Sequence, residues 1–272
     1  MTLVIASRTK KEVSFSSDSR ITFGNAGHFD KGIKIFNVPF KLKGPAKSRE
    51  DFNKYEFELE YGIAVVGSSI NAYTVKDSIV EILPNITYLT NLSDISIIGI
   101  GTLVYEIYEQ VSKELTPILM ENGFCEILMG GYCLVQKKIR ILRFYPEVTD
   151  TEIKYFYEEV LPNEGMMFFG SGKGIAERIY NENNSLEPLQ VLKKVINSEE
   201  DKAIGGAMQS GSFYTENFKI SGVIEKQLDN EGNLVQSIKY RRGYIVEDEI
   251  TKSTKPPYLF VSYGYKQVEF KN

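Results

Sequence analysis

The fold is decided by residues 2–25, which read TLVIASRTKKEVSFSSDSRITFGN. The first six of them, Thr2–Ser7, form a short β-rich run of the kind that is covered on both faces. Residues 12–17 alternate in polarity, and the polar residues between the two runs predict a hairpin that turns near Lys10. A hairpin centred on Lys10 places Thr2 opposite Asp18, and such cross-strand neighbours lie about 5 Å apart at Cβ.

Length and composition are those of a folded globular protein. The 272 residues, 42% hydrophobic and 25% charged, suit one large domain or two small ones. The 32 basic and 36 acidic residues leave a net charge of −4 and form no basic patch for nucleic acid or a membrane surface. The chain has no apolar run of membrane-spanning length and no signal-peptide pattern at its start. We expect a cytoplasmic protein with no nucleic-acid or membrane partner.

The chain contains one histidine, His28, and two cysteines, Cys125 and Cys133. These are too few for a disulfide framework or a zinc site of the usual kind. Because His28 lies in a glycine-containing loop segment, we expect any catalytic base to be another group. The segment Gly170–Gly174 lacks the first glycine and the hydroxyl residue of a phosphate-binding loop. We therefore expect no metal and no other cofactor.

The remaining elements come in runs of strands and runs of helices. Strands are predicted at Tyr61–Val66, Cys125–Leu134, Lys138–Tyr145, Thr151–Tyr157, Met166–Phe169 and Tyr258–Val261. Helices are predicted at Ala72–Ile82, Ile97–Glu121 and Leu189–Ile196, and a further helix follows the glycine-rich turn Gly170–Gly174 and runs through Tyr180. The segment Lys41–Tyr55 is predicted to be a polar inserted loop. This order favours an α+β protein whose helices cover the outer faces of stacked sheets.

The segments Thr2–Ala6 and Asp18–Asn25 resemble the start of a proteasome β-type subunit, a plan shared with the bacterial proteasome-like peptidases. The family pattern has an N-terminal threonine, an Asp-Ser-Arg-x-Thr-x-Gly-Asn segment and a lysine. Here Lys34 follows Asp18 by sixteen residues, as Asp18 follows Thr2. Further matches are Val65–Ser69, Phe169–Gly172 and Asp201–Gly206. The resemblance implies the four-layer αββα sandwich of N-terminal-nucleophile (Ntn) hydrolases over residues 1–215, with a β-rich extension over residues 216–272.

The resemblance also implies a mechanism that needs no histidine. The Thr2 hydroxyl would attack an amide carbonyl, and the free α-amino group of Thr2 would act as its base, since such amines titrate close to neutral pH. Lys34 would favour the neutral amine and Asp18 would orient Lys34, while the backbone N–H of Gly67 would stabilise the oxyanion. The implied catalytic residues are Thr2, Asp18, Lys34, Gly67, Ser171 and Asp201. The implied substrate-binding residues are Ile21, Thr22, Gly32, Val65 and Ser69, which suit an extended peptide with apolar side chains.

The expected function is therefore hydrolysis of peptide bonds in peptides or unfolded proteins by a ring-like homo-oligomer, with an unfoldase as a further partner. The alternative is a catalytically inactive scaffold or assembly protein, in which Asp18 and Lys34 form a buried ion pair and Thr2 is never freed. Two features bear on this choice. Ile204 stands where the family pattern has a serine, and a retained Met1 would turn the Thr2 nitrogen into an amide. A third interpretation is a hydrolase of non-peptide amides.

Overall fold

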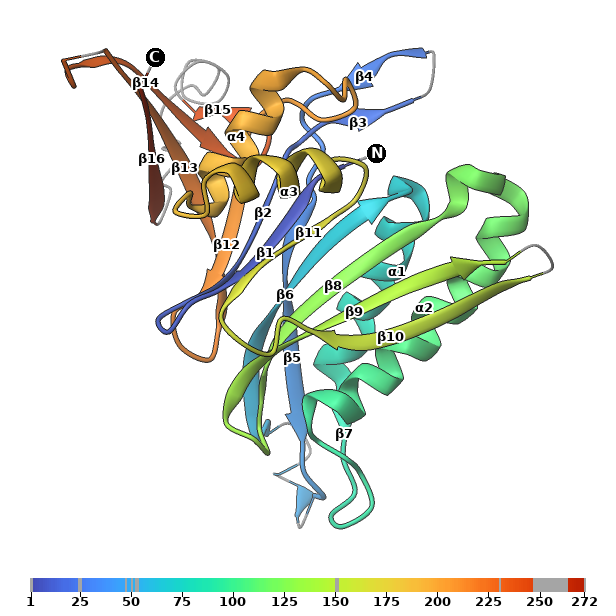
Figure 1. The fold of residues 1–272 in the computed structure, drawn as a ribbon. Coiled ribbons are helices and arrows are strands. Elements are labelled where there is room, and N and C mark those ends of the chain that lie inside the picture. Colours follow the sequence, from blue (N-terminus) through green and yellow to red (C-terminus); the bar gives the residue numbers. More distant parts are fainter. Residues whose placement is uncertain are drawn as a thin grey trace, which may run out of the picture. The chain divides into compact units, whose positions relative to one another are not determined.

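The computed structural model describes residues 2–23, 26–46, 48–49, 51, 54–149, 152–229, 231–246 and 264–271. Within these ranges the chain is a mixed α/β protein with two large sheets and the helices α1–α4 (Figure 1). It divides into two compact units. Unit 1 comprises Met1–Ile35, Glu164–Ser212 and Ile220–Asn272, and unit 2 comprises Phe36–Asn163 and Phe213–Lys219. The four-layer stacking and the boundary at residue 215 stay predictions.

The sheet of unit 1 has the strand order β11-β1-β2-β12-β13-β14-β15, and β16 pairs with β13. Its strands are β1 (Val4–Arg8), β2 (Val13–Ser17), β11 (Gly165–Phe169), β12 (Gln209–Phe213), β13 (Phe218–Leu228), β14 (Leu234–Arg241), β15 (Tyr244–Ile245) and β16 (Tyr265–Lys271). A short ribbon of β3 (Ile21–Thr22) and β4 (His28–Phe29) follows β2. The predicted strand Tyr258–Val261 lies outside the described residues.

Helices α3 (Lys173–Glu182) and α4 (Pro188–Ser198) cover one face of this sheet (Figure 1). A capping box between Glu187 and Gln190 fixes the start of α4, where Pro188 takes the first position. The apolar side of α4 packs with residues of β1 and β11 in one buried cluster. This cluster includes Leu3, so the beginning of the chain packs against the apolar core of unit 1.

The hairpin of β1 and β2 forms as predicted, but its register differs by one residue. Val4 pairs with Ser17 and Arg8 with Val13, so the centre of the hairpin lies between residues 10 and 11. The reason is a two-residue turn, in which the N–H of Thr9 donates to the carbonyl of Glu12 at 2.8 Å. The predicted pairing of Thr2 with Asp18 is therefore wrong, because the register brings Leu3 opposite Asp18.

The sheet of unit 2 has the strand order β10-β9-β8-β6-β5-β7. Its strands are β5 (Ile35–Lys43), β6 (Phe57–Gly67), β7 (Ile86–Thr87), β8 (Cys125–Cys133), β9 (Lys138–Val148) and β10 (Ile153–Val160). Helices α1 (Ser69–Ile82) and α2 (Ile97–Leu119) cover one face of it, and short 3-10 turns follow them at Leu83–Asn85 and Met120–Gly123 (Figure 1). Of the helices that the structure describes, none has the length and apolar character needed to cross a membrane.

Two features of unit 2 differ from the sequence prediction. The strand β5 was not predicted, and its end takes up the first residues of the expected loop Lys41–Tyr55. The helix Ile97–Glu121 was predicted from its apolar residues, but the last two residues that α2 buries are polar, Ser112 and Thr116. These polar side chains are hydrogen-bonded inside the unit, so a count of apolar residues misses them.

Candidate active site

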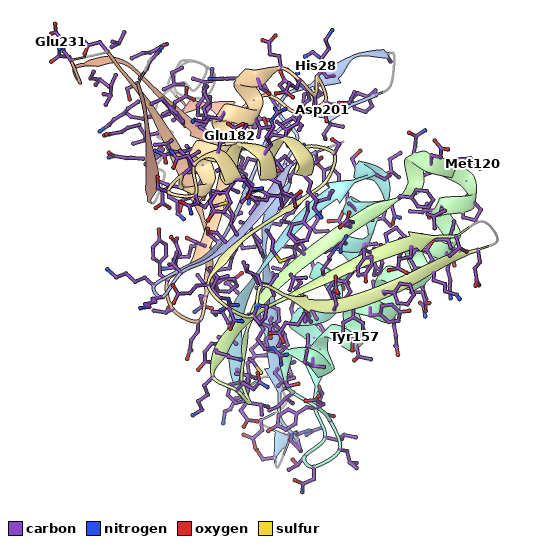
Figure 2. The ribbon with its side chains drawn as sticks, viewed as in Figure 1. His28, Met120, Tyr157, Glu182, Asp201 and Glu231 are labelled. Carbon is purple, nitrogen blue, oxygen red and sulfur yellow. The ribbon has the colours of Figure 1, made fainter. Side chains whose placement is uncertain are left out.

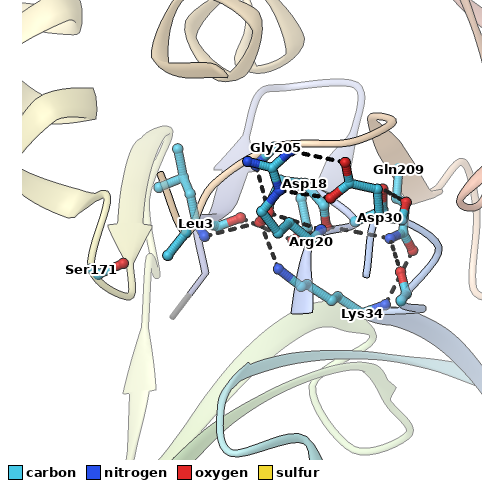
Figure 3. Close-up of polar contacts among 12 residues, drawn as sticks. Leu3, Asp18, Arg20, Asp30, Lys34, Ser171, Gly205 and Gln209 are labelled. Carbon is cyan, nitrogen blue, oxygen red and sulfur yellow. Dashed lines mark hydrogen bonds and ion pairs between the residues drawn. The ribbon is translucent and has the colours of Figure 1, made fainter. Parts of the chain in front are cut away.

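Asp18 and Lys34 form a buried ion pair in unit 1 (Figure 3). The Lys34 Nζ lies 2.8 Å from Asp18 Oδ1, and the two side chains are 4% and 0% exposed. The same Oδ1 accepts the backbone N–H of Leu3 at 3.1 Å. The other oxygen, Oδ2, accepts the N–H groups of Arg20 at 3.1 Å and Gly205 at 3.2 Å. Four donors thus fix the Asp18 carboxylate. Each of these hydrogen bonds is stronger because the carboxylate is charged.

Burial lowers the pKa of Lys34 from its ordinary value, and the charge and hydrogen bond of Asp18 oppose this shift only in part. A lysine with a lowered pKa gives up its proton more readily than one at the surface. Such a shift beside a specific charged partner is common at catalytic sites. The Asp18–Lys34 pair, which is bonded to the N–H of Leu3 just before β1, is therefore a candidate functional group of unit 1.

Thr2 is the residue immediately before the peptide that Asp18 holds. It is 2% exposed, and its neighbour Leu3 is anchored both by the hydrogen bond to Asp18 and by the buried cluster under β1. The hydroxyl of Ser17 donates to the carbonyl of Leu3 at 2.9 Å, which fixes the same residue a second time. The residue that follows Thr2 is therefore held at both its N–H and its carbonyl. Met1 lies outside the described residues.

Ser171 and Asp201 form a second polar contact in unit 1. The Ser171 hydroxyl donates to Asp201 Oδ2 at 2.7 Å, and the N–H of Ala203 donates to Asp201 Oδ1 at 2.9 Å. In the view of Figure 3, Leu3 lies between Ser171 and Lys34. The structure thus brings together the expected pairs Asp18–Lys34 and Ser171–Asp201 within the same unit.

Ile204 lies in the apolar core of unit 1. Its side chain is 3% exposed and belongs to the same cluster as Leu3. A Cβ added at Gly172 would collide with the Ile204 side chain and lie 3.1 Å from Leu3 Cβ. Ile204 therefore fills space between Leu3 and Gly172, where it offers no hydrogen-bonding group.

Of the expected substrate-binding residues, Ile21, Thr22 and Gly32 lie in unit 1. Ile21 packs on Gly32, since an added Cβ there would come 2.5 Å from Ile21 Cδ1. Thr22 follows Ile21 in β3. In the part of the chain that the structure describes, the buried Thr22 Oγ1 has no hydrogen-bond partner. The structure therefore brings Ile21 and Gly32 together beside the segment that carries Lys34.

Val65, Gly67 and Ser69 belong to unit 2, where β6 ends and α1 begins. Gly67 has φ +87°, which side-chain-bearing residues rarely adopt, and an added Cβ would lie 2.5 Å from the carbonyl of Phe124. Only glycine fits this turn. Val65 is buried in the core of unit 2. The joining of these residues with the Asp18–Lys34 pair into one site stays a prediction.

Arg20 and Asp30 tie the β3–β4 ribbon to the rest of unit 1. Arg20 Nε and Nη2 donate to the two Asp30 oxygens at 2.6 and 2.8 Å, and Nη1 donates to the carbonyl of Lys202 at 2.9 Å. The single histidine, His28, lies exposed on β4 (Figure 2), 3.7 Å from Asp30. The hydrogen bonds from Arg20 hold the pKa of Asp30 below its ordinary value.

The Asp30 carboxylate should make the protein less stable in acid. The pKa of Asp30 is lower in the folded state than in the unfolded state. Its contribution to the free energy of unfolding is therefore complete above the ordinary pKa of an aspartate, and it is lost as the pH falls through the lowered pKa. We expect Asp30→Asn to reduce the melting temperature at neutral pH and to have a smaller effect at about pH 3. Thermal unfolding at both pH values checks this, and an equal loss at both would contradict it.

Three functional candidates were not predicted from the sequence: Gln209, Ser19 and the Arg20–Asp30 pair. Ser19 is fully buried, and its hydroxyl donates to the carbonyl of Asp30 at 2.6 Å and accepts the N–H of Ala207 at 2.7 Å. In the sequence, the only sign of such a residue is a polar side chain within a run of small and apolar residues, as at Gln209. That pattern does not show which residues the side chain binds.

The cysteines and metal-binding groups offer no chemistry in the described residues. Cys125 and Cys133 are both buried and free, and burial raises the pKa of the Cys125 thiol. Among the residues that the structure describes, no group of three or more His, Cys, Asp or Glu side chains could hold a metal ion.

Solved structures similar to this chain include Anbu proteins. The Anbu complex of Pseudomonas aeruginosa, solved as a helical assembly, shares 14% identity over 80% of this chain and 85% of its own, with a TM-score of 0.54. Anbu (ancestral beta-subunit) from Yersinia bercovieri shares 14% identity over 80% and 86%, with a TM-score of 0.53. Anbu from a Hyphomicrobium species shares 12% identity over 88% and 87%, with a TM-score of 0.51. No protein-family model and no curated protein matches the chain.

These structures correct the family suggested by the sequence. The motifs in residues 2–34 indicated a proteasome β-type Ntn hydrolase or a bacterial proteasome-like peptidase, whereas the similar structures are Anbu proteins. At this identity the likeness is one of fold. The physical reason for the error is that Asp18–Asn25 specifies a hairpin end and a buried carboxylate, and these belong to the fold as much as to any one activity.

Proposed function

We propose that the chain hydrolyses amide bonds, in particular peptide bonds after apolar residues, with the Thr2 hydroxyl as nucleophile. The observation that carries this proposal is the buried Lys34–Asp18 pair at 2.8 Å, bonded to the peptide that follows Thr2. A buried charge pair is a poor source of stability, so its presence beside a hydroxyl favours a chemical use. The proposal requires Met1 to be removed, and it includes a cytoplasmic location.

In the proposed reaction, Thr2 Oγ attacks the substrate carbonyl carbon while its proton passes to the Thr2 α-amine. The positive charge of Lys34 would favour the neutral form of that amine, and Asp18 holds Lys34 in place. Collapse of the tetrahedral intermediate breaks the C–N bond, and the leaving amine takes the proton. Water then hydrolyses the Thr2 ester by the same route in reverse. Ser171 and Asp201 would support the Thr2 amine.

The proposed substrate site needs residues of both units. Thr22 would pair its backbone with an extended peptide, and Ile21, Gly32, Val65 and Ser69 would line an apolar pocket. Gly67 would supply the oxyanion donor, since its glycine backbone lets a substrate carbonyl approach closely. This part of the proposal requires the four-layer order of the sheets, which stays a prediction.

We propose further that the chain acts as a homo-oligomer, ring-like or helical, with unfolded protein as substrate and an unfoldase as partner. The support is indirect. A similar solved structure, at 14% identity, is a helical assembly of the Anbu complex. Size-exclusion chromatography with light scattering of the purified chain tests the oligomer, and a monomer at micromolar concentration would contradict it.

The second candidate function is a catalytically inactive assembly scaffold. Two observations favour it: Thr2 is 2% exposed, and Ile204 fills the space under Leu3 with a side chain that cannot hydrogen-bond. In a scaffold the Asp18–Lys34 pair would fix the end of the hairpin and nothing more. The two candidates make opposite predictions for the state of the N-terminus.

The intact mass of protein expressed with an untagged N-terminus is the deciding experiment. A mass short by one methionine, together with turnover of a panel of peptide and acyl-amide substrates, supports the hydrolase. Preference for acyl-amides over peptides would keep the nucleophile and replace the substrate class. A full-length mass from cells with normal methionine removal would leave the Thr2 nitrogen as an amide and favour the scaffold.

A further inference from the structure

Gln209 makes three hydrogen bonds from a fully enclosed position in unit 1. It is the first residue of β12 and is 2% exposed. Its Nε2 donates to the carbonyls of Gly32 at 2.7 Å and Asp18 at 3.3 Å. Its Oε1 accepts the backbone N–H of Lys34 at 3.1 Å. Figure 3 shows this side chain among Asp18, Asp30 and Lys34.

These bonds serve a segment that has little regular structure of its own. Residues 30–34 connect β4 to β5 and lie outside both strands. Gly32 donates its N–H to the carbonyl of Ser19 at 2.9 Å, but its carbonyl and the N–H of Lys34 are bonded by Gln209. Buried backbone groups must be paired, so the carboxamide of Gln209 takes the place that a neighbouring strand would fill.

The position of the Lys34 backbone determines where its ammonium can go. A lysine side chain has four rotatable bonds, and only an anchored Cα directs its Nζ reliably to one carboxylate oxygen. Gln209 binds the backbone of both members of the ion pair, because its carboxamide bonds the carbonyl of Asp18 and the N–H of Lys34 at the same time. At the far end of the segment, Asp30 is held by Arg20.

We propose that Gln209 is a positioning residue, whose carboxamide sets the Lys34 ammonium against Asp18 by bonding the backbone of both residues. The inference rests on the proposed function for its catalytic consequence, whereas its geometric consequence stands alone. Gln209 touches neither substrate nor reacting atoms in this scheme and acts through Lys34.

The test is Gln209→Met, which keeps the length of the side chain and removes all three hydrogen bonds. We expect a crystal structure of this variant to show the Lys34 Nζ–Asp18 Oδ1 distance lengthened beyond hydrogen-bonding range. Turnover should fall by about tenfold or more, because displacement of a catalytic group lowers the rate steeply. KM should change less than kcat, since Gln209 itself contacts no substrate in this scheme and reaches the proposed pocket only through the carbonyl of Gly32.

A second variant and a control complete the design. Gln209→Asn keeps the carboxamide on a side chain one methylene shorter, so its turnover should lie between those of the parent and Gln209→Met. If the methionine variant does not fold, the Lys34–Asp18 distance in Gln209→Asn decides the matter. Ser14→Ala removes the buried 2.8 Å contact with Ser7 in the same sheet and should leave both the pair and kcat unchanged.

The inference is overturned if Gln209→Met and Gln209→Asn keep the Lys34–Asp18 pair at its original distance, whatever the activity. It is also overturned if Ser14→Ala lowers kcat as much, because the effect would then be general destabilisation. A parent protein without turnover would remove the proposed function. In that case the Lys34–Asp18 distance in the variants still tests the positioning.

Discussion

Thr2→Ala is expected to abolish hydrolysis and to leave the fold and the oligomer intact. The hydroxyl is the proposed nucleophile, and the Asp18–Lys34 pair is bonded to the peptide N–H that directly follows Thr2. Loss of a nucleophile usually lowers kcat by about a thousandfold or more, because the remaining groups act as a unit with it. Steady-state hydrolysis of the best peptide from the substrate panel measures this loss.

Two matched variants separate chemistry from structure in this experiment. Thr2→Ser keeps a hydroxyl and an N-terminal amine and should retain measurable turnover. Thr102→Ala removes a threonine hydroxyl from the exposed side of α2, in unit 2, and should have no effect on turnover. Equal activity of Thr2→Ala and the parent protein would show that another residue is the nucleophile, or that the activity belongs to a contaminant.

The Thr2→Ala variant should lose hydrolysis and still form the same oligomer as the parent protein. Thr2 precedes β1 and contributes no part of the ladder with β2 or β11. Unaltered elution and melting temperature of Thr2→Ala would therefore confirm that the lost activity reflects the hydroxyl. A variant that elutes differently would indicate that Thr2 supports packing, as expected for the scaffold.

The beginning of the chain shows how far the sequence can predict the site. The resemblance stated for the sequence implied that Asp18 orients Lys34, and the structure joins them at 2.8 Å. The same analysis misplaced the hairpin register by one residue. Turn length decides the register, and a run of polar residues such as Arg8–Glu12 does not show which two of them form the turn.

The remaining differences come from side chains whose partners are distant in sequence. Gln209 lies 175 residues from Lys34, and neither residue reveals the other in a single sequence. The strand β5 was missed because it carries polar residues whose charge is compensated by the neighbouring strand β6. Lys41, for example, forms an ion pair with Glu58 of β6. Polar groups that are satisfied by long-range hydrogen bonds or ion pairs do not follow the hydrophobic pattern, so a pattern-based prediction places them in loops.

Lys34→Met should cause the largest loss of stability of any substitution considered. It removes the ammonium and leaves the Asp18 carboxylate buried with backbone donors alone. Breaking a buried ion pair on one side typically costs about 3–5 kcal/mol, because a charge remains without its counter-charge in a medium of low polarity. Urea unfolding of both proteins at neutral pH, followed by circular dichroism, measures the difference in the free energy of unfolding.

A double-mutant cycle distinguishes loss of the pair from loss of packing. Asp18→Asn alone should also be strongly destabilising, since it leaves the Lys34 ammonium buried. The double variant should lose clearly less than the sum of the two, because neither partner then remains charged. As a surface control, Lys154→Met breaks the exposed 2.7 Å contact with Glu152 and should change stability by less than about 1 kcal/mol. Additive losses at Asp18 and Lys34 would show that the two residues are not coupled, and the proposed arrangement of the site would then be wrong.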